Sequence, residues 1–378
     1  GGYKMLKEGY VRIPSGCAIS GIIDRTGRLF SGQSITDSIA TMHDRSNGLG
    51  GGFAAYGIYP DFKDYFAFHV FYDDLIAKQE TENILKANYI VALEEKIPTR
   101  KTAHIKNAPL IYRYFAIPKP EKLKLSELDE NEFTIKFVFN INSNIPGAYV
   151  FSSGKNMGVF KAVGYPEDVA NFYKLESYKG YMWLAHGRFP TNTPGWWGGA
   201  HPFNLLNISV VHNGELSSYD TNRKYLEEFG YICTLQTDTE VAAYIFDLLL
   251  RRHGLPIELA CKVVASPLWK QVERMSPKEK ILYTNLKIIY GRALLNGPFS
   301  MIIAYEDGFI AINDRIKLRP LTAAKKGDMI YVASEESAIR QVCKNPESVW
   351  IPRGGEPVIA ELIRDNEKEI YSTKEVTA

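Results

Sequence analysis

Cys17 is the residue of this sequence best suited to covalent chemistry. It lies at the start of the run 16–24, which alternates apolar and small residues as a buried strand would. A thiolate is a strong nucleophile, but an ordinary thiol with a pKa near ~8.5 is mostly protonated at neutral pH and needs a base. A lone cysteine beside a strand is more often a small buried hydrophobe, and Cys233, Cys261 and Cys343 keep that interpretation.

Arg188 and Asp238 could bind the two charged groups of a zwitterion. Arg188 follows a predicted strand at 181–186, and Asp238 stands at the start of a predicted helix. A guanidinium can hold a carboxylate through two parallel hydrogen bonds, and a carboxylate can hold an ammonium group. Taken singly, Asp238 is explained by the helix dipole and Arg188 by a surface ion pair, so only the two together indicate a binding site.

Asn213 and Gly214 directly follow a predicted strand at 208–212. The simplest interpretation of an Asn-Gly pair is a tight turn. The alternative is that the Asn213 side-chain amide and the Gly214 backbone N–H donate hydrogen bonds to an oxyanion. The loop 194–200 is equally open, because its two tryptophans and three glycines fit either a mobile lid or a rigid turn with packed rings.

Four segments in this order resemble the class II glutamine amidotransferases, which are N-terminal-nucleophile enzymes. The segments are Cys17-Ala18-Ile19-Ser20-Gly21, His186-Gly187-Arg188-Phe189-Pro190-Thr191-Asn192-Thr193, His212-Asn213-Gly214-Glu215 and Thr237-Asp238-Thr239-Glu240. The resemblance implies that Cys17 attacks the side-chain amide of L-glutamine and that Asn213 and Gly214 are the oxyanion donors. It also implies that Arg188 and Asp238 bind the carboxylate and the ammonium group of glutamine.

Further residues of these segments match positions around the glutamine pocket. Phe189, Thr191 and His201 are implied to bind the substrate. His186 and His212 end predicted strands beside the motifs, and we expect them to orient their neighbours or to belong to the core.

The base implied by the resemblance is the α-amine of Cys17 itself. An α-amine with a pKa of ~7.7–8.0 is a competent acid and base at neutral pH. This requires Cys17 to be the first residue of the active chain, so residues 1–16 are predicted to be a leader that is cleaved before Cys17. If the leader is never removed, the alternative is a non-catalytic glutamine-sensing regulatory subunit.

The spacing narrows the resemblance to the amidotransferase of glutamate synthase, because roughly 170 residues separate Cys17 from Arg188. Other segments similar to that domain are Ile97-Pro98-Thr99, Ala108-Pro109-Leu110-Ile111, Trp196-Trp197-Gly198-Gly199-Ala200-His201-Pro202-Phe203, the run 314–320 and Ala333-Ser334-Glu335. The resemblance implies a stand-alone, archaeal-type subunit that passes ammonia to a glutamate synthase catalytic partner carrying flavin and iron–sulfur centres. It implies no cofactor and no metal on this chain. A glutaminase subunit that serves another acceptor is the alternative.

The elements that must position these residues indicate an α+β fold. Strands, then helices, then strands again favour two antiparallel sheets between helices, and the resemblance implies the four-layer αββα sandwich of N-terminal-nucleophile hydrolases. Residues 17–378 are expected to form one glutamine amidotransferase domain. Residues 60–180 are predicted to be an inserted α/β segment, because no Gly/Ser-rich or Pro-rich linker flanks them.

Several local elements are predicted in more detail. The run 133–140 is rich in β-branched and aromatic residues and is predicted to be extended. Thr36 is a possible helix cap. Thr237 and Glu240 have the spacing of a capping box at the start of an apolar helix.

Composition excludes several classes of protein. The formal net charge is only +2 and the basic residues are dispersed, which argues against nucleic acid as the main ligand. No run approaches the ~20 apolar residues needed to cross a bilayer, and residues 1–16 lack the apolar core of a secretory signal. The four cysteines are too far apart for a paired metal motif. We therefore expect a cytoplasmic protein.

Overall fold

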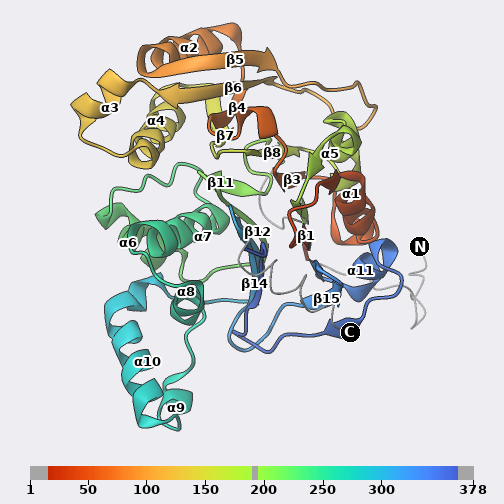
Figure 1. Cartoon of the computed structure of the whole chain (residues 1–378), viewed down its shortest axis with the longest axis vertical. Coiled ribbons are helices and arrows are strands. Elements are labelled where there is room, and N and C mark those ends of the chain that lie inside the picture. The colour runs from red at the N-terminus through yellow and green to blue at the C-terminus, as the bar shows by residue number, and fades with distance from the viewer. Residues whose placement is uncertain (1–15, 190–194, 365–378) are drawn as a thin grey trace, which may run out of the picture.

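Two antiparallel sheets lie face to face at the centre of the molecule, and helices cover their outer faces (Figure 1). The computed structural model describes residues 16–189 and 195–364. The first sheet has seven strands in the order β17-β15-β16-β1-β10-β3-β8. Its strands are β1 (Ala18–Asp24), β3 (Gly51–Tyr56), β8 (Met157–Ala162), β10 (Met182–Gly187), β15 (Thr322–Lys326), β16 (Met329–Ala333) and β17 (Ser348–Trp350).

The second sheet has five strands in the order β11-β12-β13-β14-β18. They are β11 (Phe203–Leu205), β12 (Ile208–Gly214), β13 (Phe299–Tyr305), β14 (Gly308–Asn313) and β18 (Val358–Glu361). Successive side chains of a strand point to opposite faces. Val211 and Ile302 accordingly pack with the first sheet, whereas Val210 and Ile303 pack in a second core with the helices outside.

Helices cover both outer faces of this pair of sheets. The first sheet carries α1 (Gln33–Ala40), α5 (Pro166–Phe172) and α11 (Glu336–Val342), and the second carries α7 (Asp238–Asp247) with α6 (Tyr219–Glu228) beside it. This layering confirms the predicted αββα sandwich. After α7 follow α8 (Ile257–Val264), α9 (Trp269–Val272) and α10 (Pro277–Tyr290). None of the helices in the described ranges is long and apolar enough to cross a membrane.

A separate four-stranded sheet, in the order β5-β6-β4-β7, lies beside the sandwich, at the top of Figure 1. Its elements are β4 (Phe66–Tyr72), α2 (Leu75–Asn88), β5 (Tyr89–Lys96), β6 (Leu110–Pro118), α3 (Pro120–Ser126), α4 (Glu130–Asn144) and β7 (Ala148–Ser152). Its two ends are neighbours, because the N–H of Ala67 donates to the carbonyl of Gly154 at 2.8 Å. The next strand, β8, pairs with β3 and so belongs to the first sheet. The elements of the added sheet therefore occupy a shorter stretch of sequence than the predicted insertion 60–180.

Short elements complete the chain. They are the two-stranded sheet of β2 (Phe30–Ser31) and β9 (Lys179–Gly180), the 3₁₀ turns η1 (His43–Arg45), η2 (Pro60–Phe62), η3 (Leu175–Ser177) and η5 (Gly291–Ala293), and the π-helical turn η4 (Leu248–Arg252) that continues α7.

The prediction of an extended run at 133–140 is wrong, because these residues lie within α4. Asp129 caps this helix by accepting the N–H of Glu132 at 2.8 Å. Ile135, Val138 and Ile141 recur at helical spacing and are buried. Burial of this helical stripe in the core outweighs the strand preference of the individual residues.

Two predicted caps also differ from the structure. Thr36 lies inside α1, where its hydroxyl donates to the carbonyl of Gly32 at 2.8 Å. Thr237 does cap α7 by accepting the N–H of Thr239 at 3.3 Å. The reciprocal half of the capping box is absent, because Glu240 accepts backbone N–H groups from the segment before the cap instead.

Candidate active site

Antiparallel pairing brings Cys17 and Arg188 together, although they are far apart in the sequence. Ala18 of β1 is paired with Gly187 of β10, so Cys17 precedes this pair on one strand and Arg188 follows it on the next. The N–H of Arg188 donates to the carbonyl of Gly50 at 2.8 Å, which extends the pairing of β10 with β3 by one residue. The sheet register therefore sets the position of both residues.

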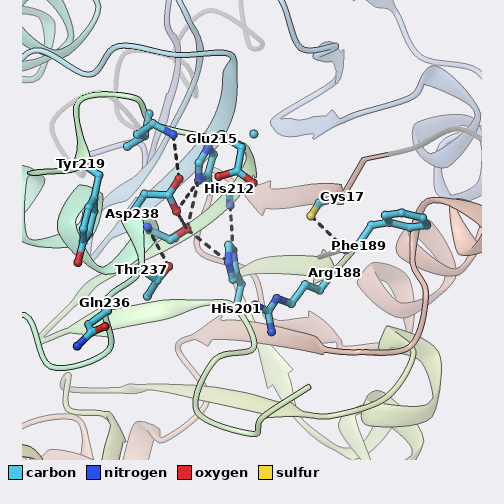
Figure 2. Close-up of a pocket in the computed structure, with 13 residues that line it drawn as sticks. Cys17, Arg188, Phe189, His201, His212, Glu215, Tyr219, Gln236, Thr237 and Asp238 are labelled. Carbon is cyan, nitrogen blue, oxygen red and sulfur yellow. Dashed lines mark hydrogen bonds and ion pairs between the residues drawn. The ribbon is translucent and has the colours of Figure 1, made fainter. Parts of the chain in front are cut away.

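These residues line a pocket of about 380 Å³ together with the end of β12 and the start of α7 (Figure 2). The lining residues are Cys17, Arg188, Phe189, His201, His212, Gly214, Glu215, Leu216, Tyr219, Gln236, Thr237, Asp238 and Thr239. The structure thus brings together all the predicted site residues that it describes, with Asn213 buried next to Gly214. Thr191 and residues 1–15 of the predicted leader lie outside the described residues.

The Cys17 sulfur is partly buried at the end of the pocket next to β10. The backbone N–H of Phe189 donates to it at 3.3 Å. Burial raises the pKa of the thiol, and Glu215 adds to this rise, while the Phe189 N–H and the positive charges of Arg188 and Arg319 lower it. Burial prevails, so the thiol needs a proton acceptor in order to react at neutral pH.

Asn213 and Gly214 do not form the tight turn that their sequence also allowed. Both belong to β12, where they pair with Ser300 and Phe299 of β13. Among the described residues, no group accepts a hydrogen bond from the side-chain nitrogen of Asn213, although that atom is buried. Gly214 has a φ of 143°, and a Cβ there would lie 1.9 Å from the carbonyl oxygen of Pro298. Only glycine therefore fits this position without a shift of the backbone.

Arg188 and Asp238 supply the positive and the negative group of the pocket. Burial lowers the pKa of Arg188, while Cys17 and Glu215 oppose that shift. Burial also acts on Asp238 and raises its pKa, but nearby His212 and hydrogen bonds, including one from the Leu216 N–H at 2.9 Å, outweigh burial. The pKa of Asp238 therefore lies below its usual value, and its carboxylate remains charged at neutral pH.

Three histidines pack together at the pocket, where His201 and His212 belong to the lining and His186 lies behind them. His201 stacks on His186 with 3.9 Å between the ring centroids, and His212 donates its backbone N–H to Nδ1 of His201 at 3.4 Å. Burial lowers the pKa of His186 to about 3 and that of His201 well below its usual value, so both rings are neutral. Within residues 16–189 and 195–364, no group of three or more His, Cys, Asp or Glu side chains is arranged to hold a metal ion.

The loop before β11 has packed tryptophans in the part that the structure describes. Trp197 is 8% exposed and meets Phe71 and Phe172 edge-on, with centroid distances of 5.6 and 5.8 Å. Trp196 is 49% exposed and lies against Tyr149. Trp197 is thus packed as the rigid-turn interpretation predicts, whereas Trp196 is exposed, so the choice between a turn and a lid stays a prediction.

Sequence reasoning assigned no role to Glu215, Tyr219 or Gln236, which also line the pocket. Glu215 lies in the His212-Asn213-Gly214-Glu215 segment, so that motif could have indicated its place in the pocket. Gln236 adopts a φ of 52°, the left-handed conformation, directly before the cap of α7. Tyr219 is the first residue of α6, and its sequence context carries no signal for a pocket.

The αββα sandwich, with a cysteine directly before a central strand and a guanidinium and a carboxylate in the same pocket, is the arrangement of hydrolases of the N-terminal-nucleophile type. The family model of the class II glutamine amidotransferases matches residues 74–351. The chain belongs to this family of enzymes. Cys17 precedes the matched range, so its assignment depends on its place in the pocket.

Individual relatives cover most of the chain. An uncharacterized protein of Archaeoglobus fulgidus is 52% identical over 94% of both chains. A proposed glutamine amidotransferase of Methanothermobacter thermautotrophicus is 25% identical over 89% of this chain and 97% of the relative. Among solved structures, the glutamine phosphoribosylpyrophosphate amidotransferase of B. subtilis aligns with 92% of this chain and 50% of its own, at 16% identity and a TM-score of 0.44.

Proposed function

We propose that this chain hydrolyses L-glutamine to L-glutamate and ammonia through a thioester on Cys17. The observation that carries the proposal is a pocket lined by a thiol, a guanidinium and a carboxylate. Directly before its lining residue Gly214 lies Asn213, a buried amide whose side-chain nitrogen has no hydrogen-bond partner among the described residues. Glutamine needs a nucleophile, an oxyanion site and a clamp for its amino-acid end, and these groups match that list.

The clamp consists of Arg188 and Asp238. The guanidinium receives the α-carboxylate of glutamine, and the ionised Asp238 receives the α-ammonium group. With this end fixed, the side-chain amide of glutamine extends towards the sulfur of Cys17. Phe189, Thr191 and His201 are assigned to the surrounding substrate site.

The chemical step begins with attack of the Cys17 sulfur on the amide carbon. The thiol proton passes to the α-amine of Cys17, and the oxyanion accepts hydrogen bonds from Asn213 and from the N–H of Gly214. The protonated amine then gives its proton to the leaving nitrogen, and ammonia departs. Water hydrolyses the thioester, which releases glutamate and restores the thiol.

The mechanism requires that residues 1–16 are removed, because an α-amine in a peptide bond cannot accept a proton. Gly16 has a φ of 137°, and a Cβ there would meet Arg319 and Asn213, each at 3.5 Å. These are ordinary contact distances, so it is the positive φ that favours glycine before Cys17. A glycine also adds no side chain that could obstruct attack of the neighbouring thiol on the carbonyl of residue 16. If the leader remains in the native protein, the domain can only sense glutamine.

The ammonia is proposed to pass to a glutamate synthase catalytic subunit that carries flavin and iron–sulfur centres and aminates 2-oxoglutarate. The length of chain between Cys17 and Arg188 and the segments that resemble glutamate synthase support this partner. No cofactor is assigned to this chain, and the reaction is placed in the cytoplasm. The alternative partner is an enzyme that aminates a different acceptor.

The test begins with the mass of the purified full chain, which reveals whether it starts at Cys17. Glutamate release from glutamine is then measured for this protein and for Cys17→Ala. We expect activity that depends on Cys17 and on a free Cys17 amine. Activity that survives Cys17→Ala, or full activity in a chain that retains Gly16, would overturn the mechanism.

A second measurement identifies the acceptor. The chain is purified together with its native partners, and ¹⁵N from the side-chain amide of glutamine is followed by mass spectrometry. Label in the amino group of glutamate formed from 2-oxoglutarate supports the glutamate synthase partner. Label in another product refutes that partner while leaving the glutaminase proposal intact.

A further inference from the structure

Lys161 carries a buried ammonium group beside the glutamine pocket, and the mechanism above does not use it. The residue lies on β8 and is 0% exposed. Its Nζ donates to the carbonyls of Gly198 at 2.9 Å and Pro202 at 3.3 Å. The same atom lies 4.6 Å from the ring centroid of Phe203 and 5.2 Å from that of Tyr149. Burying a charge costs several kcal/mol, and these carbonyls and aromatic rings offset part of that cost.

The two carbonyls belong to one loop, 198–202. The residues between Gly198 and Pro202 contact the glutamine pocket. A Cβ at Gly199 would lie 3.5 Å from Nη1 of Arg188, so the loop backbone packs against the guanidinium. His201 lines the pocket and contacts Thr239 of α7 at 3.4 Å. The loop thus forms a wall against the proposed carboxylate clamp and the histidine behind it.

The sequence of β3 leaves no room for this loop to move towards the sheet. Gly52 pairs with Lys161, and a Cβ on Gly52 would lie 2.1 Å from the carbonyl oxygen of His201 and 2.7 Å from the Cβ of Lys161. The loop is therefore held from two directions, by close contact with the glycine and by hydrogen bonds from the ammonium group.

Glu240 provides the opposing charge from α7. It accepts the N–H groups of Thr234 at 3.2 Å and Leu235 at 3.0 Å, in the segment that leads to Gln236 of the pocket. Burial lowers the pKa of Lys161 to about 7, Arg188 adds to the fall, and the charge of Glu240 opposes it. Two buried ionisable groups thus each hold one loop that lines the pocket.

We propose that Lys161 is a positioning residue for glutamine binding. Its ammonium group fastens the loop 198–202, so that Arg188 and His201 keep the geometry that receives the amino-acid end of glutamine. The inference deepens the proposed function and depends on it. It predicts a loss of affinity rather than a loss of reactivity, because Lys161 contacts neither the sulfur nor the oxyanion donors.

The experiment uses the chain that begins at Cys17, with its α-amine free, and a diazoketone analogue of glutamine. The Cys17 sulfur forms a bond to the diazo carbon, the thiol proton moves to that carbon, and dinitrogen leaves. Intact mass counts the labelled protein over time, which gives a half-saturating concentration and a maximal rate without any partner enzyme. These two quantities separate binding from reactivity.

Lys161→Met fills similar space without the charge, and Lys161→Arg restores charge and donors. The matched control is Asn222→Leu, because Asn222 is also 0% exposed and also donates to two backbone carbonyls, those of Arg292 at 2.7 Å and Leu294 at 3.0 Å. We expect Lys161→Met to raise the half-saturating concentration at least tenfold with a maximal rate within threefold of wild type. Lys161→Arg should recover most of the affinity, and Asn222→Leu should leave both values near wild type.

An unchanged half-saturating concentration in folded Lys161→Met overturns the proposal, as does an equal effect of Asn222→Leu. If Lys161→Met is insoluble, Lys161→Gln replaces it and must show the same rise in concentration. An unchanged value in that variant also overturns the proposal. Failure of the wild-type protein with a free Cys17 to react at all would instead refute the proposed function.

Discussion

At the scale of single residues, the surroundings of the Cys17 sulfur shift the pKa of its thiol in opposite directions. Burial makes the thiolate of Cys17 less stable, whereas the Phe189 N–H and two arginines make it more stable. Burial is the larger effect, so Cys17 differs from cysteines activated by a strongly depressed pKa. The chemistry then depends on a neighbouring base, and the proposed α-amine is attached to the same residue.

The first prediction concerns the pH dependence of Cys17 alkylation in the chain that retains Gly16. Because the pKa of the thiol lies above its ordinary value, its thiolate fraction at a given pH is lower than in a peptide. The rate of reaction with a small neutral alkylating agent should therefore still rise above about pH 9, where the rate for a cysteine peptide with a thiol pKa of ~8.5 begins to level off. The measurement is labelling rate against pH, with the peptide as control, and a midpoint below that of the peptide contradicts the burial argument.

The second prediction concerns the side-chain nitrogen of Asn213. Asn213→Ala removes the proposed oxyanion donor, and the expected loss is about 10²–10³-fold in kcat, or ~3–4 kcal/mol, with little change in KM. Asn142→Ala in α4 serves as control, because this asparagine bonds to Val150 in the added sheet, with its oxygen 2.8 Å from the Val150 nitrogen. Glutaminase kinetics on both variants provide the measurement, and a rise in KM without a fall in kcat would assign Asn213 to substrate binding instead.

At the scale of elements, β12 pairs with β13 as far as Gly214, which lines the pocket. Pro298 precedes β13, and its carbonyl lies where a side chain on residue 214 would begin. Because it has no side chain, Gly214 can pair with β13 and line the pocket at the same time. The same constraint explains why an Asn-Gly pair, which usually indicates a turn, is here the end of a strand.

The third prediction compares two glycines with positive φ. Gly214→Ala places its Cβ against the Pro298 carbonyl, so we expect a loss of stability of about 2–4 kcal/mol together with loss of activity. Gly230→Ala is the control, because its φ is 79° and a Cβ there meets nothing within 4 Å. It should cost only about 1 kcal/mol and leave activity intact. Urea denaturation measures both, and equal costs would contradict the role of the Pro298 contact.

Sequence reasoning was reliable where a residue type is scarce or its chemistry is specific. Cys17, Arg188 and Asp238 carry groups that few other residues could supply, and the structure brings them to one pocket. Tyr219 could not be predicted, because its presence in the pocket depends on how α6 is placed on α7. Similarly, the residues 133–140 were misread because strand propensity is local, whereas the apolar stripe of α4 is chosen by the core against which it packs.

At the scale of the whole molecule, buried ionisable groups link stability to pH. Burial raises the pKa of Glu240 to about 7 from 4.5. The folded state then binds more protons than the unfolded state between these values, so this group makes stability fall as pH rises from 4.5 to 7. Lys161 acts in the opposite sense above its pKa of about 7, where the unfolded state holds the proton more tightly.

The fourth prediction follows from this linkage. Glu240→Gln should remove a fall in the free energy of unfolding of up to about 3 kcal/mol between pH 4.5 and 7, at 1.36 kcal/mol per pKa unit. Chemical denaturation at several pH values measures it, with Glu80→Gln at an exposed position of α2 as control. Parallel pH profiles for wild type and Glu240→Gln would show that Glu240 is not the source of the dependence.

The two neighbours of β1 have a mechanical consequence for catalysis. Chain ends usually fray, yet β1 is hydrogen-bonded to β10 on one side and to β16 on the other, and the N–H of Ile19 also donates to the Ser334 hydroxyl at 3.1 Å. A newly exposed terminus at Cys17 would thus lie one residue before a strand that is held on both sides. Thermal displacement of the Cys17 sulfur would be small. Binding of glutamine would therefore cost little further orientational entropy of the sulfur.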